Sequence, residues 1–399
     1  MKKLGKVIVG SAAALAGFGV AMNTLVLTPV SMKNKLKREA KELEQNPPDP
    51  NSPQEQMKQE GYAWLGKQNS EHVVIKNHDG ERIHSFIVRA AQPTTHWVVM
   101  CHGYTSSPER MGEYALQYQK QGYNILLPAM RGHGVSETKF ISMGWKDRLD
   151  VIDWIHYLVE EDENAQIVLH GVSMGSATVM MVTGEELPVN VKCCIADCGY
   201  SSVWDEFNNE LKTAYHLPTF PFLYAADAVT KLVGGYGYKE ASSIKQLQKS
   251  HTPTLFIHGE EDKFVPYRML DLNYNAAACP KEKLSIPDAE HAEAHRVHPE
   301  IYWPAVWTFV GKYVEPDSKP AEVVAEVKKT AKKTAEIAAD TAKNAVKAAK
   351  ETVKPVAEKA EKAAKRVKAE PKPAARPAAK PASKKAAPAK PKKETAKED

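Results

Sequence analysis

The 399-residue sequence has few cysteines and none of the short motifs that bind metals. Its five cysteines include no Cys-x-x-Cys pair, and its 14 histidines include no His-Glu-x-x-His arrangement, so neither common zinc pattern is present. The odd number of cysteines also argues against a disulfide framework. We therefore expect no metal and no cofactor. Three cysteines fall inside apolar runs and are expected to be small core residues: Cys101, Cys193 and Cys194.

Charged side chains are missing from residues 7–30, which follow the basic start Met1-Lys2-Lys3. About 20 apolar residues are enough to cross a bilayer as a helix, whereas a secretory signal usually has an apolar core of about 7–15 residues. We therefore expect residues 1–30 to be an uncleaved single-pass membrane anchor, with a cleaved signal as the alternative. The short basic N-terminus resembles an export signal, so we expect the body of the protein to be extracytoplasmic. The lysines that follow the segment and the unpaired cysteines favour the opposite orientation.

The C-terminal region differs in charge from the rest of the chain. Residues 319–399 hold 23 Lys or Arg against 11 Asp or Glu, a net charge of +12, whereas the whole chain has a net charge of +5. Such asymmetry is typical of a tail that meets a polyanion, and a solvated spacer is the simpler alternative. Anionic lipid headgroups and anionic cell-envelope polymers are candidate partners. Nucleic acid is disfavoured because no aromatic side chains are interleaved with the charges.

An eleven-residue repeat occupies the first part of this tail, in residues 330–340, 341–351 and 352–362. A period of eleven is about 3.67 residues per turn, so the repeat predicts a helix with a thin stripe of alanines, interrupted at Pro355. We place the tail at 317–399. At the other end, residues 31–60 are polar and rich in proline near their close, which predicts a semi-extended connector.

A Gly-x-Ser-x-Gly pentapeptide spans residues 171–175, directly after the apolar run Ile167 to Leu169. Small residues on both sides of a serine allow a strand to turn sharply into a helix with the hydroxyl exposed. Short glycine and serine patterns also occur by chance in turns. Ser173 is therefore a candidate nucleophile whose case depends on partners elsewhere in the chain.

Candidate partners follow two later apolar runs. Thr254 to Ile257 leads into a loop that contains Asp262, and Leu284 to Ile286 precedes His291. An acid just past a strand end can reach an imidazole across the top of a sheet, so Asp262 is the favoured acid and His291 the favoured base. Other acids and histidines occupy comparable positions. The alternative acids are Glu260, Glu261 and Asp197; His295 is the alternative base, and His170 and His258 are expected to be packing or loop residues.

The distribution of apolar runs predicts the fold class. Residues 73–75 and 83–88 predict a hairpin, and strands near 97–101, 124–128, 166–170, 192–197, 254–258 and 283–286 alternate with helical patterns such as 145–160. This alternation predicts an α/β fold with a mainly parallel sheet and helices on both faces. The candidate loops then fall at the carboxyl ends of strands, where ligands bind in such sheets.

Residues 61–316 resemble an α/β-hydrolase, and they are most similar to bacterial single-domain serine hydrolases that include monoacylglycerol-lipase-like esterases and related peptidases. The resemblance implies a Ser173, Asp262 and His291 triad, with an oxyanion hole formed by the N–H groups of Tyr104 and Met174. Five motifs, in the family's order, carry it: His102-Gly103, Arg131-Gly132-His133-Gly134 with Ser136, residues 171–175, residues 258–266, and Glu290-His291-Ala292.

An aromatic insert interrupts the alternation at about 200–245, where related hydrolases carry a cap. Aromatic stripes more often pack against a sheet than line a pocket, and we favour packing here. A small apolar cap would still favour a hydrophobic acyl group. The expected function is hydrolysis of small-molecule carboxylic esters through an acyl-enzyme. The alternatives are an aminopeptidase-like or amide hydrolase, because fold does not select the bond, and an inactive envelope-binding scaffold that acts through its basic tail.

Overall fold

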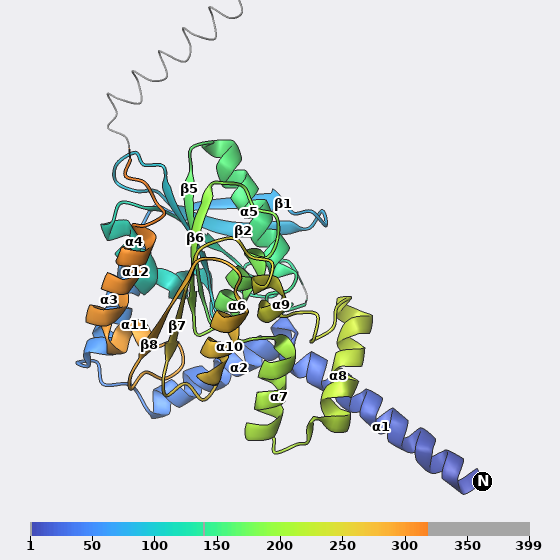
Figure 1. Ribbon diagram of the computed structural model, residues 1–399. Helices are drawn as coiled ribbons and strands as arrows, with labels where there is room; N and C mark the ends of the chain where they lie inside the picture. Colours follow the sequence, from blue (N-terminus) through green and yellow to red (C-terminus); the bar gives the residue numbers. More distant parts are fainter. Residues whose placement is uncertain (1, 139, 318–399) are drawn as a thin grey trace, which may run out of the picture. The chain divides into compact units, whose positions relative to one another are not determined.

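Strands and helices alternate along most of the chain in the computed structural model, which describes residues 2–138 and 140–317 (Figure 1). The eight strands form one sheet in the order β1-β2-β4-β3-β5-β6-β7-β8. β1 and β2 are antiparallel to their neighbours, and the other pairs are parallel. The strands are β1 (Glu71–Lys76), β2 (Arg82–Val88), β3 (His96–Cys101), β4 (Asn124–Pro128), β5 (Gln166–Val172), β6 (Val191–Asp197), β7 (Thr254–Gly259) and β8 (Lys281–Ile286).

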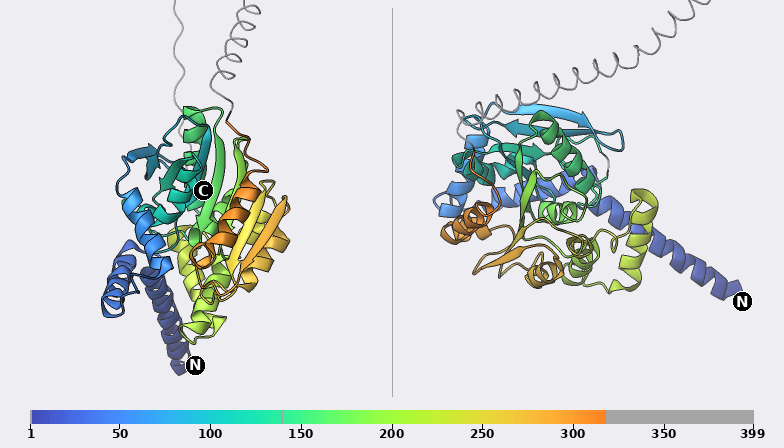
Figure 2. Two further views of the ribbon diagram at one scale, coloured as in Figure 1. Left: turned by 90° about the vertical axis from the view of Figure 1, so that its left-hand side faces the viewer. Right: turned by 45° about the horizontal axis from the view of Figure 1, so that its top comes forward.

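Helices cover both faces of the sheet (Figures 1 and 2). Successive side chains of β3 point to opposite faces of the sheet. Val99 therefore lies in the hydrophobic core on one face, and Val98 lies in the core on the other face. The Val99 side packs against α5 (Asp147–Glu161), α6 (Met174–Val182), α9 (Ser243–Leu247) and α10 (Arg268–Ala276). The Val98 side packs against α4 (Gly112–Lys120), α11 (Ala294–Val297) and α12 (Pro299–Val310), and a 3-10 turn, η1 (Pro108–Met111), precedes α4.

The sheet confirms the predicted fold class and most of the predicted strands. Asn77 and Gly80 form the turn between β1 and β2, where the N–H of Gly80 donates to the Asn77 carbonyl at 2.8 Å. Gly80 has a φ of +78°, a conformation that glycine adopts at little cost. The helix predicted from residue 145 begins at Asp147.

The cap lies between β6 and β7, as predicted, and consists mainly of α7 (Val203–Thr213) and α8 (Thr219–Gly234). Local sequence signals mark the start of α7 and the end of α8. The Ser202 hydroxyl caps α7 by accepting from the N–H of Asp205 at 3.0 Å, and Gly235 ends α8 in the left-handed conformation. The exposed large hydrophobic side chains of α8 are Phe220, Tyr224, Leu232 and Val233.

The N-terminal segment is helical, as α1 (Lys2–Val26) and α2 (Pro29–Gln45). Among the helices that the structure describes, none is long and apolar enough to cross a bilayer, so the predicted transmembrane helix is not found there. Instead, the second half of α1 packs against α8. Gly19 allows close approach, since a Cβ there would lie 2.7 Å from the carbonyl oxygen of Ala225.

The connector predicted for residues 31–60 is also helical over much of its length, because α3 (Pro53–Leu65) follows α2. α3 packs tightly on α4 through two glycines: a Cβ on Gly112 would lie 2.5 Å from the Gly61 carbonyl oxygen. The prediction of a semi-extended spacer is therefore wrong. The local pattern of polar residues gave no sign that α3 would pack against α4. The basic tail and its eleven-residue repeats lie in residues 318–399, outside the described residues.

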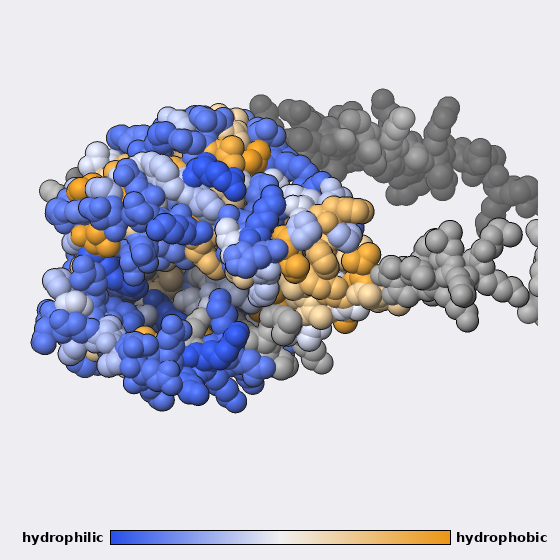
Figure 3. All heavy atoms as spheres, turned by 90° about the horizontal axis from the view of Figure 1, so that it is seen from below, coloured by the Kyte–Doolittle hydropathy of each residue, from blue (hydrophilic) through white to orange (hydrophobic). Residues whose placement is uncertain are grey.

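Hydrophobic residues gather over part of the surface viewed in Figure 3, beside a largely hydrophilic area. On the second half of α1, Val20 is an exposed large hydrophobic residue, with 54% of its surface accessible. Phe18 and Met22, two residues to either side, are partly buried against the core. One face of this helix is therefore exposed to solvent, and the opposite face packs against the rest of the protein, as expected for an amphipathic helix.

Candidate active site

Ser173 occupies a sharp turn between β5 and α6, with φ at 58° and ψ at −117°. The two flanking glycines make this turn possible. A Cβ on Gly171 would lie 2.2 Å from the carbonyl oxygen of Gly175, and a Cβ on Gly175 would lie 1.9 Å from that of Cys101. No side chain fits at either distance. The local sequence therefore produces the strained turn that the pentapeptide predicts.

Three side chains from separate strand ends form one hydrogen-bonded chain. The Nε2 atom of His291 lies 2.8 Å from Ser173 Oγ, and its Nδ1 atom lies 2.7 Å from Asp262 Oδ2. Ser173 and Asp262 are buried, while the His291 side chain keeps 22% of its surface accessible. The structure thus brings together all three residues proposed for the triad. This geometry fits a nucleophile, a base and an orienting acid.

Asp262 is held in place by more than His291. Its other carboxylate oxygen accepts from the N–H groups of Phe264 at 3.0 Å and Val265 at 2.9 Å. The Nε2 atom of His258 lies 3.2 Å from Asp262 Oδ2. Burial would raise the pKa of Asp262, but hydrogen bonds from His258 and His291 outweigh it and lower the pKa. The carboxylate is therefore ionised at neutral pH and favours a proton on Nδ1 of His291.

The alternative acid Asp197 lies at a neighbouring strand end, but its carboxyl group has different hydrogen-bond partners. Its Oδ2 atom accepts from the hydroxyl of Tyr302 at 2.9 Å, and its backbone carbonyl accepts from the N–H of Ser173 at 2.9 Å. Complete burial raises the pKa of Asp197 to about 6. No hydrogen bond joins its carboxyl to His291 in the described part of the chain. The alternatives Glu260 and Glu261 are exposed at the loop surface.

The alternative base His295 and the other two histidines at strand ends are engaged elsewhere. His295 is fully buried, with its Nε2 atom 3.1 Å from Glu113 Oε2. His170 lies between the hydroxyls of Tyr118 and Tyr302, at 3.1 and 3.2 Å, and burial lowers its pKa to about 3. His170 is a packing residue, as expected. His258 is also buried, as expected, and its Nε2 atom lies 2.9 Å from the Val265 carbonyl oxygen as well as near Asp262.

Two buried histidines shape the loop that follows β3. His102 accepts at Nε2 from the N–H of Met130 at 3.2 Å, so its proton sits on Nδ1, next to the Gly103 carbonyl at 2.9 Å. His133 accepts at Nε2 from the N–H of Thr105 at 3.2 Å. Burial lowers the pKa of both imidazoles, so both are neutral. These bonds fix the backbone on either side of Tyr104, and a Cβ on Gly103 would lie 3.3 Å from Ser173 Cβ.

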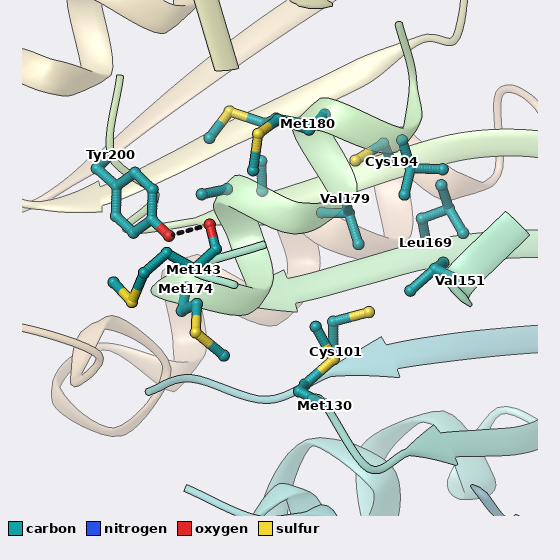
Figure 4. Packing of buried hydrophobic residues seen from close by; sticks show 14 of the residues in the cluster. Cys101, Met130, Met143, Val151, Leu169, Met174, Val179, Met180, Cys194 and Tyr200 are labelled. Carbon is teal, nitrogen blue, oxygen red and sulfur yellow. Dashed lines mark hydrogen bonds between the residues drawn. The ribbon is translucent and has the colours of Figure 1, made fainter. Parts of the chain in front are cut away.

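Met174, the second residue proposed for the oxyanion hole, is the first residue of α6. The N–H groups of the first turn of a helix have no acceptor within that helix, so the N–H of Met174 is available beside Ser173. Its side chain is buried in the core near Tyr200, whose hydroxyl donates to the Met143 carbonyl at 2.9 Å (Figure 4). Met174 directly follows the serine, and Tyr104 follows Gly103, the residue that approaches the serine.

A cavity of about 290 Å³ opens onto Ser173. Its walls come from the cap, from the loop at Phe264 and Val265, and from the N-terminal helices. The expectation that cap aromatics mainly pack against the sheet holds for Tyr236, which is buried, whereas others line the cavity. The aromatic residues of the insert that line it are Phe207, Tyr215, Phe222 and Tyr238.

Sequence reasoning missed two sets of cavity residues. The first set comes from α1 and α2, whose apolar run favoured an anchor: Phe18, Met22, Val26, Lys35 and Arg38. The second is the pair Glu206 and Glu210 on α7. These glutamates are four residues apart and so share a helix face. Spacing of this kind is common on solvated helices, so the sequence offered no signal that the face is enclosed.

Two groups of side chains in residues 2–138 and 140–317 lie close enough to hold a metal ion: Cys198 with Asp262 and His291, and His78 with Asp150 and Asp153. In the first group both imidazole nitrogens of His291 already bond to Ser173 and Asp262. In the second, Asp150 bonds to Arg131 at 2.6 Å. All five cysteines are buried with free thiols.

Comparison with known proteins bears on the fold and on the segment that holds Ser173. A family model described as serine aminopeptidase, S33, matches residues 92–214, a range that holds Ser173 but neither Asp262 nor His291. The uncharacterized protein YqkD of Bacillus subtilis is 28% identical over 222 residues, which are 55% of this chain and 73% of that protein. The thermostable monoacylglycerol lipase of Bacillus sp. strain H-257 is 31% identical over 96 residues, 23% of this chain and 36% of the lipase.

Among solved structures, the Pyrococcus furiosus esterase Pf2001 superposes with a TM-score of 0.52 at 22% identity, covering 64% of this chain and 96% of that one. At this identity the likeness shows the fold alone. The sheet order and these matches together show that the chain has an α/β-hydrolase fold.

Proposed function

We propose that the protein is a serine hydrolase that cleaves carboxylic esters through an acyl-enzyme. The observation that carries this proposal is the hydrogen-bonded chain from Ser173 through His291 to Asp262, with the serine hydroxyl at the wall of a cavity. The esterase and monoacylglycerol lipase named among the similar proteins support the same reaction class.

His291 is the proton carrier of the proposed reaction. A serine hydroxyl is a weak nucleophile at neutral pH, so the imidazole takes its proton as Oγ attacks the ester carbonyl. The imidazole then gives that proton to the departing alcohol, leaving an acyl group on Ser173. A water molecule repeats the sequence and releases the acid. Asp262, kept ionised by its hydrogen bonds, stabilises the imidazolium that forms in each half.

The carbonyl oxygen gains negative charge when Oγ attacks, and it needs donors that are already in place. The N–H of Met174 at the start of α6 and the N–H of Tyr104 in the loop after β3 are the proposed donors. The fixed conformation of that loop, held by His102 and His133, supports this role because fixed donors need no reorganisation during the reaction.

The cavity walls favour an apolar acyl group. The apolar lining residues of the cavity include Phe18, Phe207, Leu211, Phe222 and Leu223. Burying hydrocarbon against such walls contributes roughly 25 cal/mol per Å² of apolar surface. We therefore expect medium-chain acyl esters to be better substrates than acetate.

The test of the proposal is hydrolysis of p-nitrophenyl esters of increasing acyl length by the full-length protein and by Ser173→Ala. We expect turnover that rises from acetate to octanoate and that disappears in the variant. Folded wild-type protein with no turnover of any ester, or a variant within tenfold of the wild type, would refute the proposal.

An amide or N-terminal peptide bond is the second candidate, because the family model that matches residues 92–214 is named for an aminopeptidase. The same triad cleaves both kinds of bond. Anilides of matched acyl length distinguish the two, since an amide hydrolase cleaves them at rates comparable with the esters. A scaffold with an inactive hydrolase body is excluded if either panel shows turnover that depends on Ser173.

A further inference from the structure

Glu206 is a buried acid that has no partner in the fold. It lies on α7 with 3% of its surface exposed, and it lines the cavity that contains Ser173. Neither carboxyl oxygen has a hydrogen-bond partner among the described residues. The neighbouring Asp205, in contrast, accepts from the Ser202 hydroxyl at 2.8 Å. Glu206 therefore takes no part in the hydrogen bonds at the N-terminus of α7.

Every other buried acid in the described part of the chain has at least one hydrogen-bond partner. Glu113 accepts from Arg296 Nε at 2.7 Å, and Asp150 accepts from Arg131 Nε at 2.6 Å. A buried polar group without a partner destabilises a fold, because it loses its hydrogen bonds to water and gains none. Glu206 makes no visible contribution to the stability of the cap. Its position in the cavity wall indicates that its partner is a ligand.

We propose that Glu206 is a specificity-determining residue that binds a hydroxyl group of an otherwise apolar ester substrate in the cavity beside Ser173. The proposal rests on the proposed ester hydrolysis. A carboxyl group donates from one oxygen and accepts at the other, and a hydroxyl group offers one donor and acceptor lone pairs in return. The two groups can therefore satisfy each other without introducing a charge into apolar surroundings.

The charges around the cavity favour a neutral ligand group. Burial raises the pKa of Glu206 well above its ordinary value, and the nearby carboxylates of Glu210 and Asp262 raise it further, against a weaker opposing effect of Arg268. An uncharged carboxyl gains little from an ammonium group. Lys35 and Arg38 also line the cavity and repel a cation, while the nearby carboxylates of Glu210 and Asp262 disfavour an anion.

The hydroxyl has two possible sources, the acyl chain or the alcohol of the ester. Two substrate series separate them. The acyl series compares p-nitrophenyl hexanoate with its 6-hydroxy and 6-amino derivatives. The alcohol series compares propyl hexanoate with 2-hydroxyethyl and 2-aminoethyl hexanoate. Full-length wild type, Glu206→Gln and Glu206→Leu are assayed on all six esters. Glu186→Gln, which changes an exposed glutamate after α6, is the matched control.

We expect the wild type and Glu186→Gln to prefer the hydroxylated member of one series by about tenfold or more in kcat/KM. Glu206→Leu should lose this preference while it still cleaves the unsubstituted ester within about threefold of the wild type. Glu206→Gln should keep part of the preference, because an amide also donates and accepts. The thermal unfolding midpoint of Glu206→Leu should equal or exceed that of the wild type, because an unpaired carboxyl has been removed.

Several results would overturn the assignment. They are no hydroxyl preference in either series, a preference that survives in Glu206→Leu, a stronger preference for the amino esters, or a uniform loss of turnover with a lower unfolding midpoint. In each of these cases, Ser173-dependent turnover of the unsubstituted ester would still support the proposed ester hydrolysis. Failure of the inference is thus distinguishable from failure of the proposed function.

Discussion

Phe18 and Phe222 pack edge to face, with their ring centroids 4.7 Å apart, and join the N-terminal helix α1 to the cap helix α8. A buried polar contact reinforces this pair, because the Thr230 hydroxyl donates to Asn23 Oδ1 at 2.7 Å. The amide nitrogen of Asn23 donates to the Ala226 carbonyl at 3.1 Å. The N-terminal helix is therefore a wall of the cavity beside Ser173.

The first prediction concerns that wall. Phe18→Ala removes an aromatic ring from the cavity lining, so kcat/KM for p-nitrophenyl octanoate should fall about tenfold while the value for acetate changes less than about twofold. Val20→Ala is the matched control, because Val20 lies on the same helix and is 54% exposed. Equal effects of the two substitutions on octanoate would show that α1 takes no part in binding the acyl chain.

The second prediction separates the two acids at neighbouring strand ends. Asp262→Asn removes the carboxylate that orients His291 at 2.7 Å, and it should lower kcat by about 10⁴-fold. Asp197→Asn should leave kcat within about tenfold, because Asp197 bonds to Tyr302 and not to the imidazole. Steady-state kinetics on one ester measure both. A larger loss in Asp197→Asn would reassign the acid.

The third prediction concerns stability in acid. Burial alone would raise the pKa of Glu113, but hydrogen bonds from Arg296 and His295 outweigh it and hold the pKa at about 2, below its ordinary value of 4.5. A depressed carboxyl pKa gives stability that is fully present above pH 4.5 and is lost as the pH falls toward about 2. The shift corresponds to about 3 kcal/mol of unfolding free energy.

Urea unfolding of the wild type and Glu113→Gln between pH 2 and pH 7 measures this contribution. The wild type should be the more stable protein at pH 7, and the difference should shrink toward pH 2. The exposed Glu186→Gln should track the wild type throughout. A difference between the wild type and Glu113→Gln that does not depend on pH would contradict the role assigned to the Glu113 carboxylate.

The fourth prediction concerns the turn that presents the serine. Gly175→Ala would place a Cβ 1.9 Å from the Cys101 carbonyl oxygen, so the variant should lose about 3 kcal/mol or more of unfolding free energy. Gly17→Ala is the opposite case, because nothing lies within 4 Å of its Cβ position in α1. It should gain up to about 1 kcal/mol from helix propensity. Chemical denaturation measures both, and an unaffected Gly175→Ala protein would disprove the close contact.

Much of the fold was predictable because the strands that lead to Ser173 and Asp262 follow local rules. Residues 167–169 and 254–257 are short apolar runs bounded by glycine and polar loops, and both are central strands. The positions of Ser173 and His291 after such strands indicated that they meet at one edge of the sheet. The order of strands and the distances between side chains depend on tertiary packing, and these came only from the structure.

The N-terminal region shows where local reasoning fails. An uncharged apolar helix is expected both for a bilayer span and for a helix packed against a cap, and residues 7–30 do not distinguish the two. Glu206 was missed for a related reason, since a glutamate on an amphipathic helix is usually solvated. Extracytoplasmic location and binding of an anionic polymer by the basic tail stay predictions from the sequence.

The most direct measurement of the central claim is labelling of the full-length protein with a fluorophosphonate, followed by peptide mass spectrometry. Such probes modify a serine whose hydroxyl is activated by a base. We predict a single modified site, Ser173, and loss of labelling in a folded His291→Ala variant. An unlabelled wild-type protein, or labelling that persists at Ser173 without the imidazole, would contradict the proposed mechanism.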